Sequence, residues 1–168
     1  LTEPASLALG ERKLYYKDLE QVQITLGVKG PAMHDERRWA YLVLNNLLGG
    51  SMSSMLFQEV REKLGLVYSV YSYLSAYRDC GALTIYAGTS ADEIDDLATL
   101  TMDELKRAAD DLSEAELARA KAQLKAGLLM GLESPSARAE RMARYLSIWG
   151  RVPDLHEATA EIDDVSVA

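Results

Sequence analysis

A strict alternation of apolar and polar residues over positions 21–29, read QVQITLGVK, is the feature that most constrains the fold. This period of two is typical of a β-strand with one buried face. The preceding segment, ERKLYYK, predicts a second strand joined to the first by a turn at Lys17-Asp18, and Gly30-Pro31 ends the pair. A half-buried strand needs a covering layer, so the chain must form a sheet that is covered on one face.

A second pair of strands is predicted over residues 66–76 and 82–89, which are rich in Tyr, Val, Ile and Thr. The turn between them is residues 77–81. Two helices precede this hairpin. The first runs from about Asp35 to Leu48, with its apolar stripe at Trp39, Leu42, Val43 and Leu47, and the second runs from a Ser53-Ser54 cap to about Lys63.

The rest of the chain is helical in pattern. Ser90 with Glu93 and Ser113 with Glu116 have the spacing of capping boxes, and Ser134-Pro135 is typical of a helix start. The helix after Ser113 has one apolar face, made of Leu117, Leu124 and Leu128. The helix after Ser134 is expected to point four apolar residues inward: Met142, Tyr145, Leu146 and Trp149. A last short helix is expected over residues 154–161.

This order of elements predicts an α+β fold with an antiparallel sheet of about four to six strands and helices packed on one face. We expect residues 1–168 to form a single domain. Because the sequence begins with Leu, it is expected to be a processed product or a fragment.

Charge and composition exclude several classes of partner. The formal net charge of −8 argues against nucleic acid and against an anionic membrane surface. No apolar stretch approaches the ~18 residues of a transmembrane helix, so we expect a soluble protein. The single cysteine, Cys80, excludes an internal disulfide and leaves cytoplasm and periplasm open.

The residues offer little independent chemistry. His34 and His156 are the only histidines, and neither HExxH nor HxxEH occurs, so no metal site is expected. Both histidines are interpreted as surface or capping residues, and Cys80 as structural. No GxSxG elbow is present, and the Gly-Gly turn at residues 49–50 lacks the lysine of a P-loop.

The stretch GGSMSSMLFQEVREKLGLVYSV, residues 49–70, resembles the signature of the second domain of pitrilysin-clan zinc proteases. These are the insulinase-like and mitochondrial-processing-peptidase-like enzymes. Further segments resemble the same family in the same order: the Gly-Pro after the first strand pair, Asp79-x-Gly81 with LTIYAGT, the helix pair ELARAKAQLKAGLLMGLES, and EIDDVS. The resemblance covers about nine tenths of the chain and implies a processing-peptidase-like α/β roll.

The resemblance also implies a division of labour. The first half of such a protease holds the zinc and the catalytic Glu, and the second contributes an Arg and a Tyr to the substrate. These map onto Arg61 and Tyr68, which would bind a peptide carbonyl and donate to the developing oxyanion. Gly49, Gly50, Ser53 and Ser54 form the loop near the substrate, the glycines for a tight turn and the serines as helix caps. Met55 departs from the family, which has an Arg there.

The resemblance therefore implies a non-catalytic, substrate-binding half of a zinc metalloendopeptidase that acts on peptides or unfolded polypeptide. The chain should hold no cofactor and be inactive alone, with zinc in a partner half on the same polypeptide or in a homo- or heterodimer. The alternative is a catalytically inert assembly subunit of the same fold. The chain stops at Val167-Ala168, where relatives continue into a helix and usually a strand, so truncation is expected.

Overall fold

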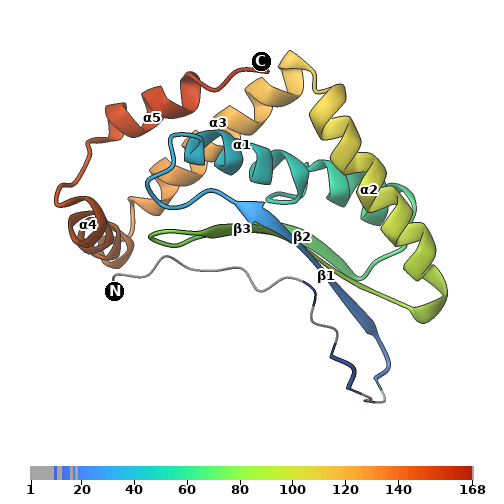
Figure 1. The fold of residues 1–168 in the computed structure, drawn as a ribbon. Coiled ribbons are helices and arrows are strands. Elements are labelled where there is room, and N and C mark those ends of the chain that lie inside the picture. The colour runs from blue at the N-terminus through green and yellow to red at the C-terminus, as the bar shows by residue number, and fades with distance from the viewer. Residues whose placement is uncertain (1–9, 11–12, 16, 18, 168) are drawn as a thin grey trace.

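The computed structural model describes residues 10, 13–15, 17 and 19–167. Its strands are β1 (Val22–Gly30), β2 (Ser69–Ala76) and β3 (Gly81–Thr89). Its helices are α1 (Arg38–Leu48), the π-helix η1 (Phe57–Lys63), the 3₁₀ turn η2 (Ala91–Glu93), α2 (Ile94–Asp110), α3 (Glu114–Gly131), α4 (Pro135–Trp149) and α5 (Leu155–Asp163). Figure 1 shows these helices above the sheet, with α4 at one end of it.

The sheet is antiparallel in the order β1-β3-β2. The hairpin places Ala76 opposite Gly81, and β1 lies on the other side of β3 with Gly30 opposite Gly81. The α+β fold is confirmed, but the described residues form three strands rather than four to six. The additional strand expected in ERKLYYK is absent at residues 13–15, and residues 11, 12 and 16 lie outside the described residues. β2 also begins at Ser69 rather than Leu66.

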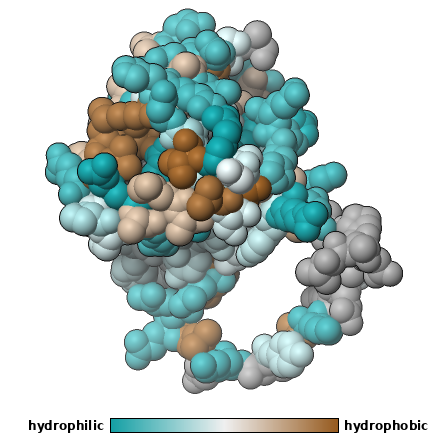
Figure 2. All heavy atoms as spheres, turned by 90° about the vertical axis from the view of Figure 1, so that its left-hand side faces the viewer, coloured by the Kyte–Doolittle hydropathy of each residue, from teal (hydrophilic) through white to brown (hydrophobic). Residues whose placement is uncertain are grey.

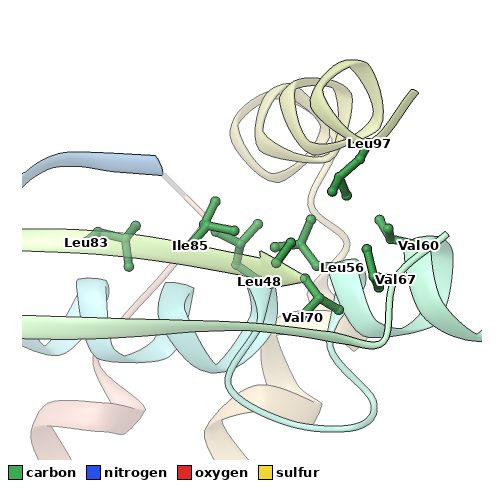
Figure 3. Close-up of a cluster of buried hydrophobic side chains, with 9 residues drawn as sticks. Leu48, Leu56, Val60, Val67, Val70, Leu83, Ile85 and Leu97 are labelled. Carbon is green, nitrogen blue, oxygen red and sulfur yellow. The ribbon is translucent and has the colours of Figure 1, made fainter. Parts of the chain in front are cut away.

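The main core lies between the sheet and the helices. Alternate residues of β3 point the same way because the side-chain period of a strand is two, and Leu83, Ile85 and Ala87 are all buried. They pack with apolar residues from α1, η1, β2 and α2 and from the segments just before η1 and β2, shown together in Figure 3: Leu48, Leu56, Val60, Val67, Val70 and Leu97. Burial of these side chains is what fixes the helices on this face.

A second core lies on the far side of α1 from the sheet. Val43 and Leu47 of α1 pack against Leu117 and Ala120 of α3 and Ile162 of α5. Leu124 and Leu128 pack partly buried against this cluster, which confirms the expected apolar face of α3. Helix α1 is therefore the layer between the sheet and α3, which explains its apolar stripe.

Of the four predicted helix caps, the two at Ser113 and Ser134 agree with the structure. Ser113 and Glu116 form the full capping box of α3, and the Ser134 hydroxyl accepts from the Ala137 amide ahead of Pro135. The Ser90 box is wrong, because Ser90 makes no side-chain cap and precedes the 3₁₀ turn η2 instead. None of the helices in the described part of the chain is both long and apolar enough to cross a bilayer.

The expected inward face of α4 is largely wrong. Tyr145 and Trp149 are half-buried, but Met142 and Leu146 are 51% and 59% exposed, and no residue of α4 is fully buried. The helical period is present, but the described chain places too little against this helix to cover its apolar side. Figure 2, which looks at the end of the molecule where α4 lies, shows hydrophobic residues gathered among hydrophilic ones.

Candidate functional site

Arg61 lies in the π-helix η1, close to the end of the helix. Its side chain is exposed, and its guanidinium carbon lies 4.8 Å from the centre of the Phe57 ring. The helix closes with the Gly65 amide donating to the Arg61 carbonyl at 3.1 Å, and Gly65 has a φ of 64°, which favours glycine. No ion pair of Arg61 with a carboxylate occurs among the described residues. The cation is thus held by an aromatic face with its N–H groups open to solvent.

Tyr68 immediately precedes β2 and is 65% exposed. Its backbone amide donates to the Gly88 carbonyl at 2.9 Å, which extends the ladder with β3 by one residue. The neighbouring Val67 is only 7% exposed, and the hydroxyl of the buried Thr89 donates to the Leu66 carbonyl at 2.6 Å. The backbone at this position is therefore fixed, while the phenol is directed away from the core.

Within the described part of the chain, the Tyr68 hydroxyl has no hydrogen-bond partner and its ring has no aromatic contact. Arg61 and Tyr68 are seven positions apart in the sequence, and the turn at Gly65 returns the chain to the sheet between them. A solvent-facing guanidinium and a solvent-facing phenol on a fixed backbone can both donate hydrogen bonds to a carbonyl oxygen.

Gly49 and Gly50 serve close packing. A Cβ at Gly49 would lie 2.6 Å from the Ser72 amide nitrogen, and one at Gly50 would lie 2.8 Å from the Asn46 Cα atom. The Gly49 carbonyl accepts from the Ser72 amide at 3.1 Å. Only a residue without a side chain allows α1 to end this close to β2.

The expected role of the two serines as helix caps is wrong. The Ser53 hydroxyl accepts a hydrogen bond from the side-chain amide of Gln123 in α3 at 2.6 Å. It therefore connects this loop to α3 instead of capping η1. The Ser54 hydroxyl is buried and has no hydrogen-bond partner. Met55, where the family resemblance led us to expect an arginine, is 3% exposed in the core. Ser53 and Ser54 thus lie within the packed interior of the loop, while Met52 next to them is 76% exposed.

The described residues do not fit a metal ion. No three His, Cys, Asp or Glu side chains gather at metal-ligand distance among them. His34 is exposed with its ring edge-on to Trp149 at 5.7 Å, and His156 is exposed on α5. Cys80 is a free, partly buried thiol next to the turn between β2 and β3.

The geometry defines an α+β domain with solvent-facing hydrogen-bond donors at one end of its sheet. The family model for the peptidase M16 inactive domain matches residues 2–124. This chain belongs to that family.

Known relatives place the match within longer proteins. An uncharacterized zinc protease of Streptomyces coelicolor is 42% identical over 160 residues, which cover 95% of this chain and 35% of the relative. A protease structure from Helicobacter pylori superposes with a TM-score of 0.80 at 26% identity, covering 89% of this chain and 36% of that one. A chain of the complex III₂ structure from Candida albicans superposes with a TM-score of 0.76 at 25% identity, covering 89% of this chain and 38% of that one. The chain thus spans about a third of the length of the relatives it matches.

Proposed function

We propose that this chain is the non-catalytic, substrate-binding half of a zinc metalloendopeptidase that acts on peptides or unfolded polypeptide. It works only together with a zinc-bearing half, on the same polypeptide or on a partner subunit. Membership of the inactive-domain family and the zinc-protease relative support the class of enzyme. The zinc would be held by the other half.

The observation that carries the proposal is the exposure of Tyr68 on a backbone fixed by β3. A tyrosine that only filled the sheet would bury its ring, and an arginine with a purely structural role would pair with a neighbouring carboxylate such as Glu62 or Asp79. Among the residues that the structure describes neither occurs, since Tyr68 is 65% exposed and Arg61 contacts the Phe57 ring without an ion pair. Both groups remain available for a substrate.

Their roles follow from their chemistry. Arg61 holds a peptide carbonyl by charge-assisted hydrogen bonds, which orients the substrate. The Tyr68 hydroxyl donates to the carbonyl oxygen as negative charge develops on it, so its contribution is larger in the transition state than in the bound substrate. The loop of Gly49 and Gly50 supports this end of the sheet by fixing α1 against β2.

Replacing Tyr68 with Phe in the complete protease tests the proposal. We expect kcat to fall roughly a hundred- to a thousandfold, the range for loss of one oxyanion-hole donor. Stability should hardly change, because the removed hydroxyl has no partner within the described chain. Tyr73→Phe, in the strand β2 that follows Tyr68 and 43% exposed, is the matched control and should leave kcat unchanged. An unchanged kcat for Tyr68→Phe, with activity of the parent enzyme intact, contradicts the assignment.

A second candidate is a catalytically inert assembly subunit of the same fold. It is favoured by the likeness to a chain of complex III₂ from Candida albicans. The polypeptide that carries this chain distinguishes the two candidates. An HxxEH motif with zinc-dependent cleavage supports the protease, whereas a complete protein without peptidase activity that is isolated within a larger complex supports the subunit.

A further inference from the structure

Three arginines without a carboxylate partner gather near one end of the sheet. Arg38 is the first residue of α1, Arg78 lies in the turn between β2 and β3, and Arg144 is on α4. Among the described residues none of the three forms an ion pair, whereas Arg37, for example, pairs with Asp35 at 2.8 Å. In a chain with a net charge of −8, these three cations from three elements form a local patch of positive charge.

These arginines line two hollows that share Met33. The first, about 360 Å³, is lined by Arg38 and Arg144 together with Ser75 and Tyr77 at the end of β2. The second, about 410 Å³, is lined by Arg78 with His34 and Ser147. No Asp or Glu side chain lines either hollow among the described residues. Their polar lining therefore consists of cations, hydroxyls and an imidazole, all of which can donate to an anion.

Arg38 is held in place by aromatic rings. Its guanidinium carbon lies 4.5 Å from the Trp39 ring centre and 5.2 Å from that of Trp149, which stacks on Tyr145 at 4.7 Å. Stacking engages the faces of the guanidinium group and leaves the N–H donors at its edge free for an acceptor. Because its orientation is fixed before binding, little conformational entropy is lost when an acceptor arrives.

A neighbouring hollow of about 400 Å³ is lined by carboxylates, so it matters for whether the site favours an anionic or a cationic ligand. It is lined by Asp35, Glu36, Glu157 and Glu161 as well as by Arg38. Asp35 is neutralised by Arg37, and Glu157 by Arg151. Glu36 and Glu161 are exposed, so water screens them, whereas Arg38 is half-buried and is screened less. Anion binding is therefore favoured in the two hollows that lack carboxylates.

We propose that these two hollows bind an acidic peptide segment, with Arg38, Arg78 and Arg144 as its carboxylate receptors. Arginine binds a carboxylate through two parallel hydrogen bonds. Three arginines spread over adjoining hollows therefore suit a peptide with several carboxylates better than they suit one small anion. The site lies at the opposite end of β2 from Tyr68. Eight strand residues at ~3.3 Å each place the two about 26 Å apart. The inference goes beyond the proposed function and holds whether or not the protein takes part in proteolysis.

The experiment measures binding of a dye-labelled peptide of alternating Glu and Ala by fluorescence anisotropy. Peptides and variants are compared at one ionic strength, and the titration is then repeated with added salt. Matched peptides carry Gln or Lys in place of Glu. We expect only the Glu peptide to bind, and its affinity to fall steeply with added salt. Arg38→Gln, Arg78→Gln and Arg144→Gln should each weaken binding about tenfold or more, as expected for loss of a charged hydrogen bond. Arg119→Gln, an exposed arginine on α3, is the control and should not change affinity.

Intrinsic tryptophan fluorescence can show whether the peptide binds at this site. Its two tryptophans, Trp39 and Trp149, both contact Arg38, so binding at this site should change intrinsic fluorescence with the same midpoint as the anisotropy. Arg78 and Arg144 are exposed, so their variants keep the fold if Arg38→Gln does not. Equal binding of the Lys peptide, or equal loss with Arg119→Gln, overturns the proposal. Inorganic phosphate that displaces the peptide at concentrations where acetate does not would identify a phosphate site instead.

Discussion

Replacing Gly49 with Ala tests how tightly the Gly-Gly loop joins α1 to β2. The added Cβ would lie 2.6 Å from the Ser72 amide nitrogen and 2.8 Å from its hydroxyl oxygen, so the nitrogen must retreat by 0.4 Å to reach even 3.0 Å. The φ of Gly49 is −157°, outside the left-handed region, so the cost arises from contact. Backbone atoms of a central sheet cannot yield as the tip of a flexible side chain can.

The magnitude follows from the bonds that would be strained. Ser72 donates its amide to the Gly49 carbonyl and its hydroxyl to the Asn45 carbonyl, both at 3.1 Å. Weakening both costs about 1–2 kcal/mol, and overpacking of a filled site costs about 1–3 kcal/mol. We therefore expect Gly49→Ala to lower the free energy of unfolding by about 2–5 kcal/mol.

Urea unfolding followed by circular dichroism provides the measurement. Gly127→Ala is the matched control, because Gly127 lies within α3 and a Cβ there meets nothing within 4 Å. The same substitution should stabilise the chain there by about 0.5–1 kcal/mol through helix propensity. The reasoning is refuted if Gly49→Ala costs less than about 1 kcal/mol while the control behaves as expected.

Three further predictions concern the core, acid stability and metal content. Leu56→Ala should lower the free energy of unfolding by about 2–5 kcal/mol in the same assay, because Leu56 is fully buried; a smaller loss would mean the core is looser than described. Hydrogen bonds from the Ser113 hydroxyl and then from Arg107 lower the pKa of Glu116 to about 2 from 4.5, so the ionised group stabilises the fold above pH 4.5 and this stabilisation is lost as pH falls towards 2. Glu116→Gln should therefore destabilise at pH 7 and destabilise much less at pH 2, where about half of the Glu116 carboxyl groups are protonated in the folded state, and a pH-independent difference would contradict the pKa. Metal analysis of the untagged chain should find well under one zinc per molecule, and the chain alone should cleave no quenched peptide; stoichiometric zinc would overturn the division of labour.

The sequence predicted the elements whose pattern is a simple period. The stripe of α1 predicts one buried face, and the structure buries Val43 and Leu47 accordingly. The alternation in β1 leaves Ile24 and Leu26 half-buried, but Val28, which was expected on the same face, is 48% exposed. Capping at Ser113 was predictable because it depends only on residues three apart. The π-helical form of η1 was not, since no local pattern of residues distinguishes a π-helix from an α-helix here.

The remaining differences arise from contacts distant in sequence. Ser53 and Ser54 are residue types typical of helix caps, but the Ser53 hydroxyl instead accepts a hydrogen bond from Gln123, seventy positions later in the sequence. The exposure of Met142 could not be predicted from helical period, because the period identifies an apolar face without saying what covers it. The arginine hollows carry no linear motif, since their residues come from α1, α4 and a turn.

The order β1-β3-β2 has a consequence for how the chain folds. The hairpin closes across a short turn, from Ala76 to Gly81, and such hairpins form in about 1–10 μs. β1 instead pairs with β3 across 51 residues at Gly30 and Gly81 and 67 at Val22 and Thr89, so a large loop must close first. The strand with the clearest pattern is therefore synthesised first and paired last. Until β3 leaves the ribosome, the apolar face of β1 is exposed and can pair with non-native segments. The slow step of folding should therefore be the docking of β1 onto β3.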